Sequence, residues 1–529
     1  MRLDTVVMNV YNNIPKKYRV TFFAAIILGL CAHLYQFTNK LFNYDELGHT
    51  PKGFGSGISL GRWGLELLGD VTDKFFGTYS LPFLNGLLTL LMIAISACFI
   101  VSALDIKDYV FCALIGGICA VFPTITCTYF FMYTAPYYGM ALLLSTLSGY
   151  LVIRKRGIIS YLCAILALTF ATGIYQAYYP VAVCLVMINM AVLAYYDEWN
   201  AKDIIKRGLF YVSFLLLGLV LYLLINQLAV RFSGVHLSEY QNIGQMSSIT
   251  ISDIGKGIIR CYSSYFSMML TRDVYQLNPT IFTKISFLLL NMSVFVITIL
   301  NLMNRQKDRI NRFMFTATIA VFPVGVFLIY LMAPNSYVYS LMLYPCLFVF
   351  LLPITLCNHM MSQNSVGGGT TATTSMIRQL ITWTSALFTT ICIFIYVWFA
   401  NGNYQALQYT NYHDLAYYTV MMSQVKGLDG FHQEMPVVFV GTEIRDITNQ
   451  AGSLVDERFN LSGKAQSNIG TYANGNIIGQ YLGFTPVTLP WEEIERLSET
   501  KEIKEMPCYP EDGSIKIVNG NIIVKLANN

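Results

Sequence analysis

The chain has 529 residues, of which 55% are hydrophobic and 14% aromatic, while only 12% are charged. This composition is more apolar than a soluble domain requires and indicates a polytopic membrane protein. The net charge of +4 is small for this length, and the basic residues are scattered among loops, which argues against nucleic acid as a partner. The twelve cysteines fall mostly inside apolar segments without metal-ligand spacing, so neither a disulfide framework nor a CxxC redox site is expected.

About eleven apolar segments are long enough to cross a bilayer, since a crossing needs ~20 apolar residues. No small-residue cleavage site follows the first of them, so we expect it to remain as a membrane helix and not to be a cleaved signal. The predicted spans are residues 20–37, 82–104, 109–128, 134–153, 158–174, 177–196, 208–230, 281–303, 313–333, 338–357 and 380–400.

Basic residues occupy alternate loops between these spans, as the positive-inside rule requires of cytoplasmic loops. The N-terminus is then cytoplasmic, and an odd number of spans places the C-terminus outside. The outer face receives two long loops, of about 38–81 and 231–280, and the tail after Asn401. The basic groups are Lys16, Lys17 and Arg19; Arg154, Lys155 and Arg156; Lys202, Lys206 and Arg207; and Arg305, Lys307, Arg309 and Arg312.

Both long outer loops contain segments with helical spacing. Residues 60–70 of the first loop and 254–265 of the second repeat apolar side chains on one face, with charged side chains beside them. Such helices would lie along the membrane surface with the apolar side down. The alternative is that they only cover exposed helix ends.

The tail changes character, because charged residues return and the apolar runs shorten to strand length. Residues 435–441 are typical of a buried strand, and residues 514–525 of a hairpin that turns at Asn519-Gly520. Residues 491–497 predict a short helix. We therefore expect an all-α membrane domain over residues 1–400 and a small extracytoplasmic α/β domain over 401–529, which is large enough for a core of its own.

An acidic pair, Asp45-Glu46, follows the first span directly and lies close in sequence to His49, Lys52 and Arg62. Adjacent carboxylates on a regular element point in different directions, so one can face a substrate while the other binds a cation or orients an arginine. An ionised carboxylate beside a sugar hydroxyl can accept its proton as that oxygen attacks an anomeric carbon. The alternative is a solvated turn or a helix cap.

Several cations and aromatic residues on the outer face are candidates for substrate binding. A guanidinium pairs two phosphate oxygens at once, so we expect one or two of the arginines to bind a leaving phosphate, with Arg62 first. Tyrosines near the outer turns of spans three to six are typical of the aromatic belt of membrane proteins, or of a platform that stacks on a sugar. The cations are Arg62, Lys256, Arg260 and Arg272, and the aromatic set is Tyr133, Tyr137, Tyr138, Tyr175, Tyr178 and Tyr179, with Gln176 among them.

The spans contain almost no ionisable residue, which weakens the hypothesis of an ion-coupled transporter, because such carriers place ionisable groups in mid-membrane.

This pattern resembles the GT-C glycosyltransferases, multi-span enzymes that use a polyprenyl-phosphate sugar donor and carry an acidic motif in the first outer loop. Within that class the chain is similar to the bacterial Gtr type II glucosyltransferase family, which is associated with O-antigen modification. The resemblance implies a donor such as undecaprenyl-phosphate glucose, an acceptor glycan assembled outside the membrane, and a place in the bacterial cytoplasmic (inner) membrane. The residues that carry it are Tyr44-Asp45-Glu46, Gly61-Arg62-Trp63, Gly173-Ile174-Tyr175-Gln176 and the hairpin of residues 509–518.

The mechanism expected from both lines of reasoning is an inverting transfer of a hexose. Asp45 would deprotonate the acceptor hydroxyl, and polyprenyl phosphate would leave toward Arg62 and an arginine of the second loop. Glu46 would orient Arg62 or hold a divalent cation such as Mg²⁺ or Mn²⁺, although no metal site is assigned. The expected substrate-binding residues are Arg62, Trp63, His49, Lys52, Tyr137, Tyr138, Tyr175, Gln176, Arg260 and Arg272.

Two other functions are compatible with the sequence. A translocase for lipid-linked oligosaccharide or polysaccharide would leave Asp45 and Glu46 without a catalytic role, and it usually has two related halves. A non-catalytic scaffold would bind cell-wall polymer through residues 401–529.

Overall fold

The structure, a computed structural model, divides the chain into two compact units. Unit 1 comprises Met1–Thr38 and Lys52–Asn401, and unit 2 comprises Asn39–Pro51 and Gly402–Asn529. The first part of the expected outer loop of about 38–81 therefore groups with the C-terminal residues. The residues described are 3–49, 53, 55–195, 199–237, 251–270, 275–304, 308–333, 337–364, 372–441, 458–461, 463–464 and 474–528.

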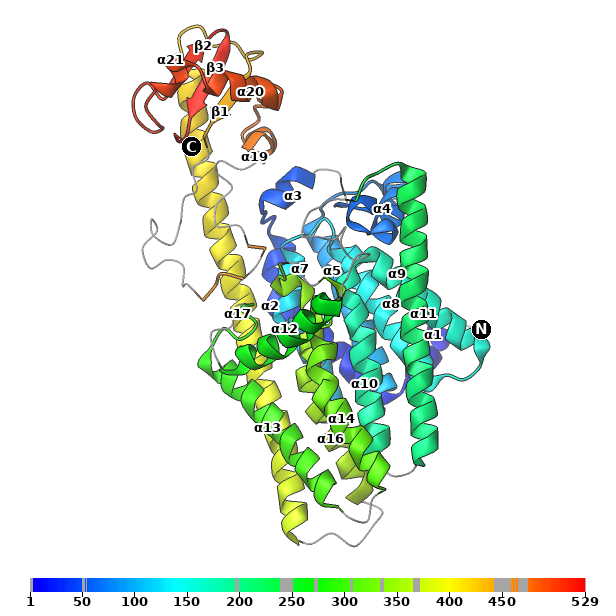
Figure 1. Cartoon of the computed structure of the whole chain (residues 1–529). Helices are drawn as coiled ribbons and strands as arrows, with labels where there is room; N and C mark the ends of the chain where they lie inside the picture. Colours follow the sequence, from blue (N-terminus) through cyan, green and yellow to red (C-terminus); the bar gives the residue numbers. More distant parts are fainter. Residues whose placement is uncertain are drawn as a thin grey trace. The chain divides into compact units, whose positions relative to one another are not determined.

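Unit 1 is built from helices, most of which Figure 1 shows packed side by side. Its α-helices are α1 (Leu3–Asn13), α2 (Lys16–Thr38), α4 (Trp63–Phe76), α5 (Pro82–Ala103), α6 (Tyr109–Val121), α7 (Pro123–Tyr129), α8 (Ala135–Arg154), α9 (Ile158–Ile174), α10 (Tyr179–Tyr195), α11 (Ala201–Ser233), α12 (Ile251–Leu270), α13 (Ile281–Met303), α14 (Arg309–Val326), α15 (Ile329–Met332), α16 (Phe348–Asn364) and α17 (Ala372–Lys426), whose residues after Asn401 belong to unit 2. Its 3₁₀ helices are η1 (Ile58–Leu60), η2 (Gln176–Tyr178), η4 (Ser340–Met342) and η5 (Tyr344–Leu347).

Eight helices of the described chain are long and apolar enough to cross a bilayer, and a ninth crossing results if α6 and α7, bent by 41°, form one span. The expected number of about eleven is not confirmed. α9 is apolar but has only 17 residues. α14 contains Pro323 and ends at Val326, and it is not among the described helices that are long and apolar enough to cross a bilayer. The coarser prediction of a mostly helical, multi-span protein is confirmed.

Close backbone approach holds the first helices together. A Cβ atom at Gly116 of α6 would lie 2.2 Å from the carbonyl oxygen of Thr21 on α2, so only glycine allows these two helices to pack at this distance. A buried polar side chain of α2 also links it to α7, since Gln36 Nε2 donates to the carbonyl of Tyr129 at 3.0 Å. Small residues and hydrogen bonds between helices are typical of helix packing in a membrane.

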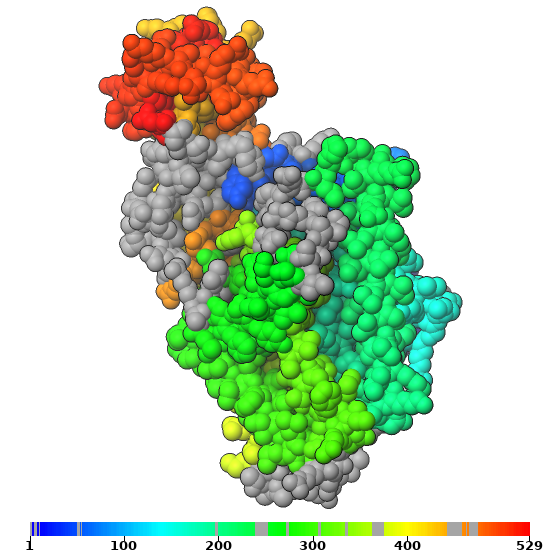
Figure 2. All heavy atoms as spheres, in the orientation of Figure 1, coloured from blue at the N-terminus to red at the C-terminus, as the bar shows by residue number. Residues whose placement is uncertain are grey.

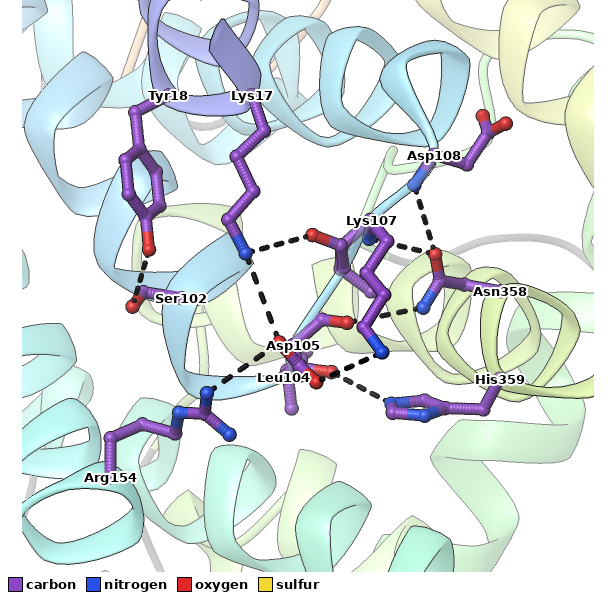
Figure 3. Close-up of polar contacts among 11 residues, drawn as sticks. Lys17, Tyr18, Ser102, Leu104, Asp105, Lys107, Asp108, Arg154, Asn358 and His359 are labelled. Carbon is purple, nitrogen blue, oxygen red and sulfur yellow. Dashed lines mark hydrogen bonds and ion pairs between the residues drawn. The ribbon is translucent and has the colours of Figure 1, made fainter. Parts of the chain in front are cut away.

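The turn between α5 and α6 joins several helices at one end of unit 1 (Figure 3). The Asp105 carboxylate lies 3.8 Å from the amines of Lys17 and Lys107 and 3.5 Å from the guanidinium of Arg154, and Asn358 donates to its carbonyl. Asp105 itself has a φ of 51°, which is uncommon for a residue other than glycine. Lys17 and Arg154, which the positive-inside rule assigns to one side, thus meet at one end of the unit.

The two amphipathic helices predicted in the outer loops are formed as α4 and α12. Both leave apolar side chains uncovered, including Leu67, Val71 and Phe75 of α4 and Ile259 and Phe266 of α12. Exposed apolar stripes of this kind suit contact with lipid.

Unit 2 contains a three-stranded sheet with the order β1-β3-β2. The first strand pairs in parallel with β3, and β2 pairs with β3 as an antiparallel hairpin. The hairpin turns at Asn519 and Gly520, whose φ values of 51° and 77° are those that a type I′ turn needs. The elements are α3 (Tyr44–His49), β1 (Val437–Val440), α19 (Asn474–Tyr481), α20 (Trp491–Ser498), α21 (Lys501–Lys504), β2 (Ile515–Val518) and β3 (Asn521–Lys525).

The strand, hairpin and short helix predicted in the tail are therefore confirmed. The core of unit 2 also contains a part that the sequence did not indicate. Phe42 and Leu47, from the first part of the expected outer loop, are buried with Tyr418 and Val425 of α17 and with Ile477 of α19. Unit 2 thus combines two segments that are far apart in the sequence.

Candidate active site

The acidic pair lies in the first turn of α3. The helix begins after Asn43, whose side-chain oxygen accepts a hydrogen bond from the Glu46 amide at 2.8 Å, as an N-cap residue does. The Asn43 amide group also donates to the carbonyl of Gly463 at 2.9 Å. Glu46 is only 1% exposed, whereas Asp45 is half-buried. Burial of Glu46 does not fit the alternative of a solvated turn.

Residues from the C-terminal part of unit 2 hold this segment in place. Asn411 of α17 makes a reciprocal pair with the backbone of Phe42, accepting from its amide at 3.0 Å and donating to its carbonyl at 2.8 Å. Gln480 of α19 donates to the carbonyl of Leu47 at 3.2 Å. Both ends of the acidic segment are therefore fixed by side chains that lie near the other end of the chain.

A tyrosine that the sequence reasoning missed lies beside Glu46. The ring of Tyr481 is 4.8 Å from that of Phe42, and its buried hydroxyl has no hydrogen-bond partner among the described residues. Burial raises the pKa of Tyr481, and the charge of Glu46 raises it further. The hydroxyl is thus a neutral donor close to the acidic pair. A single tyrosine at the end of α19, far from the acidic pair in the sequence, gives no sequence signal of this role.

His49 lies one turn after Asp45 on the same short helix. Burial lowers the pKa of His49 from its ordinary value of 6.5, and the negative charge of Asp45 opposes that effect. The imidazole is therefore mostly neutral at pH 7 and does not add a fixed positive charge to the acidic segment.

Arg62 is the centre of a second candidate cluster, in unit 1. It lies between η1 and α4, after Gly61, which has a φ of +70°. Arg62 Nη1 donates to the hydroxyl of Tyr138 at 3.2 Å, and the guanidinium lies 4.9 Å from the centre of the Tyr175 ring. These two rings are stacked on each other, with centroids 4.3 Å apart and planes inclined by 11°.

Gln176 and Tyr222 fix the turn that presents Arg62. Gln176 Nε2 donates to the carbonyl of Leu60 at 2.9 Å and to the hydroxyl of Tyr222 at 3.1 Å, and that hydroxyl donates to the carbonyl of Gly61 at 3.1 Å. The side chain of Gln176 is thus used to hold the loop, which differs from the expected contact with sugar hydroxyls.

The two short motifs that the sequence placed in separate loops pack against each other. A Cβ atom at Gly173 would lie 2.4 Å from Cε2 of Trp63, and one at Gly64 would lie 2.9 Å from the backbone of Gly173. The Trp63 ring also contacts Phe170 at a centroid distance of 5.6 Å. Trp63 is consequently wedged between α4 and α9, and it anchors the residue before it, Arg62.

Arg62 makes no ion pair with any described carboxylate. Burial acts to lower the pKa of Arg62, but the neighbouring tyrosines, Tyr138 and Tyr175 first, outweigh it and raise the pKa above its ordinary value. A charged guanidinium in a poorly hydrated site needs a counter-charge or hydrogen-bond acceptors, because desolvation is otherwise costly. The surroundings of Arg62 therefore suit an anion.

Polar atoms without partners gather around the same loop. Buried polar groups are nearly always hydrogen-bonded, so several orphan atoms at one place point to a ligand or to water. A side chain at Gly61 would lie 3.5 Å from one of these atoms, on Asn226, and a side chain at Gly55 would lie 4.0 Å from another, on Thr134. The orphan atoms of the described chain that lie here are Arg62 Nε, Trp63 Nε1, Thr134 Oγ1, Tyr175 Oη and Asn226 Oδ1.

Tyr178 also borders the Arg62 cluster, with its ring centroid 5.8 Å from that of Tyr175, and Tyr133 is among the tyrosines that act on the Arg62 charge. Two other predicted residues have different neighbours. Tyr137 lies near Thr72 and Asp73 of α4. Arg260 of α12 lies over the ring of Tyr330 at 4.4 Å, in a different part of unit 1. Lys52 and Arg272 fall outside the described residues. No group of three or more His, Cys, Asp or Glu side chains in the part of the chain that the structure describes is arranged to hold a metal ion.

A family model described as glucosyl transferase GtrII matches residues 34–350, which is more than half of the chain. The chain belongs to this glucosyltransferase family. The resemblance inferred from the sequence is thereby confirmed, and the apolar helices make this GtrII member a membrane glucosyltransferase. The matched region includes the acidic pair and the Arg62 cluster, while Asn411, Gln480 and Tyr481 lie beyond it. No curated protein and no solved structure matches the chain.

Proposed function

We propose that this GtrII glucosyltransferase moves glucose from a polyprenyl-phosphate donor to a glycan acceptor, on the outer face of a bacterial cytoplasmic membrane. The observation that carries the proposal is the half-buried Arg62, which makes no ion pair with a described carboxylate and lies among stacked tyrosines and orphan polar atoms. A phosphate that carries a sugar combines the two features this cluster suits, which are an anion for the guanidinium and a polyhydroxylated ring for the aromatic faces and hydroxyl groups.

In this proposal Arg62 binds the phosphate of the donor. Its Nε atom, which has no partner among the described residues, and its terminal nitrogens face two oxygens of the phosphate. Tyr175 and Thr134 then donate to, or accept from, the hydroxyls of the glucose unit, since their own hydroxyls are buried and unpaired. Tyr138 keeps the guanidinium in place through its hydrogen bond.

The acidic segment supplies the base. Asp45 is the more exposed carboxylate, so it accepts the proton of the acceptor hydroxyl as that oxygen attacks the anomeric carbon. The new glycosidic bond forms while the bond from the anomeric carbon to the phosphate oxygen breaks, and polyprenyl phosphate leaves with that electron pair. Attack from the opposite side inverts the anomeric configuration. Glu46, buried beside Tyr481, positions the segment, and no step requires a divalent cation.

The test is transfer of radiolabelled glucose from undecaprenyl-phosphate glucose to the acceptor glycan in membranes, at matched expression. We expect Asp45→Asn to lower transfer by about 10²-fold or more, the scale of a lost general base. Asp70→Asn is the matched control, because Asp70 is an exposed carboxylate of α4, and it should transfer as the wild type does.

Two results would contradict the proposal. If Asp45→Asn transferred glucose as well as the wild type does, Asp45 would not be the general base. A wild-type protein that transfers no glucose, but moves lipid-linked glycan across sealed vesicles, would favour the translocase alternative.

A further inference from the structure

A cavity of about 490 Å³ lies where the end of α8 and the start of α9 meet α11. Three cations line it, Lys155, Arg156 and Arg207, and no described residue that lines it is acidic. The rings of Tyr161 and Phe210 form part of the wall, 4.8 Å apart. The cavity shares no residue with the Arg62 cluster, so the proposed transfer reaction does not account for it.

Arg207 is held rigidly at this cavity. Its Nη2 atom donates to the carbonyls of Val152 and Ile153 at 3.1 and 2.8 Å, where α8 ends, and its Nε atom donates to the hydroxyl of Tyr211 at 2.9 Å. Its other terminal nitrogen donates to no described residue. Cations suit the C-terminal end of a helix, but here the guanidinium keeps one nitrogen available for a further acceptor.

Apolar side chains continue from the cavity along both neighbouring helices. Figure 2 shows α11 at the surface of unit 1. The outer faces of α9 and α11 are exposed over about two turns from the cavity, and Tyr161 links the helices through a 2.8 Å hydrogen bond to Ser213. The side chains that are at least half exposed are Ile158, Ile159 and Leu162 of α9 and Leu209, Val212 and Leu216 of α11.

We propose that this cavity binds the phosphodiester headgroup of an anionic phospholipid, whose acyl chains lie on the exposed faces of α9 and α11. Three positive charges without a lining carboxylate select a net negative headgroup, and a zwitterionic lipid would bring a cation of its own. The adjoining apolar surface selects a lipid over a free phosphate. The basic loops at residues 154–156 and 202–207 are those that the positive-inside rule assigns to the cytoplasmic leaflet, where anionic lipids gather.

The test measures lipid binding by the purified full-length protein, with native mass spectrometry and thermal unfolding in detergent. Phosphatidylglycerol, phosphatidylcholine, glycerol phosphate and undecaprenyl phosphate are added separately. We expect phosphatidylglycerol to be retained in preference to the others, and the double variant Lys155→Ala/Arg156→Ala to bind it about tenfold more weakly. Lys155→Arg/Arg156→Lys should restore binding.

The matched control is Lys202→Ala/Lys206→Ala, which removes the same charge from the same end of the protein outside the cavity. It should bind phosphatidylglycerol nearly as the wild type does. If both double variants bound phosphatidylglycerol equally weakly, general surface charge would explain the binding and the proposal would be overturned. It would also be overturned by equal retention of phosphatidylcholine, by binding of glycerol phosphate as tight as that of the lipid, or by a preference for undecaprenyl phosphate.

Discussion

The acidic segment and the Arg62 loop are neighbours in the sequence but belong to different units. Asp45 and Glu46 fold with unit 2, where Asn411 and Gln480 hold the backbone around them. Arg62 folds with unit 1, and its walls come from α8, η2 and α11. Proximity in the sequence therefore says little about which residues support a charged group.

The two regions also differ in how completely their polar groups are paired. Backbone groups around α3 are bonded by caps and by distant amide side chains, whereas the Arg62 cluster leaves five buried polar atoms without partners among the described residues. The first region is a supported segment that presents carboxylates. The second has the unused hydrogen-bonding capacity of a binding site.

Among substitutions that test this difference between the acidic segment and the Arg62 cluster, Arg62→Lys should have the largest effect on glucose transfer. Lysine keeps the charge but loses the planar fork and the contact with the Tyr175 ring, so we expect kcat/KM for glucose transfer to fall about 10- to 100-fold. Arg231→Lys, at the exposed end of α11, is the control and should leave the rate unchanged. Full activity of Arg62→Lys would show that charge alone is needed there.

Tyr481→Phe should have a smaller effect. It should lower glucose transfer without lowering thermal stability. The ring contact with Phe42 is kept, and an unpaired buried hydroxyl is removed, so thermal stability should stay equal or rise. Transfer should nevertheless fall about 5- to 10-fold if the hydroxyl serves the bound substrate or Glu46. Unchanged transfer would make Tyr481 a packing residue of unit 2 and no more.

The smallest expected effect is a loss of stability of unit 2 as the pH falls. Because burial lowers the pKa of His49 below 6.5, the unfolded chain takes up a proton that the folded chain resists, and the stability from this group is lost as pH falls through that range. Protease resistance of the region around α3 should therefore decrease between about pH 7.5 and about pH 5.5. His49→Asn should weaken this dependence, and an identical profile in both proteins would contradict the prediction.

Local patterns in the sequence were sufficient for much of the fold. Apolar periodicity predicted α4 and α12, and the pair Asn519-Gly520 predicted the hairpin, because both depend on neighbouring residues only. The number of spans was not confirmed, since α9 has only 17 residues, α14 is not apolar enough over a crossing length, and α6 and α7 are separate helices bent by 41°.

The site depends on contacts that no local pattern reveals. Arg62, Tyr138, Tyr175 and Gln176 were selected for their residue types, and the structure brings these four together. The attachment of α3 to Asn411, and the place of Tyr481, require pairing between the two ends of the chain. Without many related sequences to compare, such pairing leaves no trace in composition or spacing.

The make-up of unit 2 has a consequence for recombination between related genes. An exchange that replaced only residues 402–529 would give the acidic segment a foreign partner at Asn411 and Gln480, although every residue of the segment itself stayed the same. Hybrid enzymes made to alter acceptor choice should therefore transfer residues 39–51 together with the tail. Natural mosaics that survive selection would be expected to inherit both pieces from one parent.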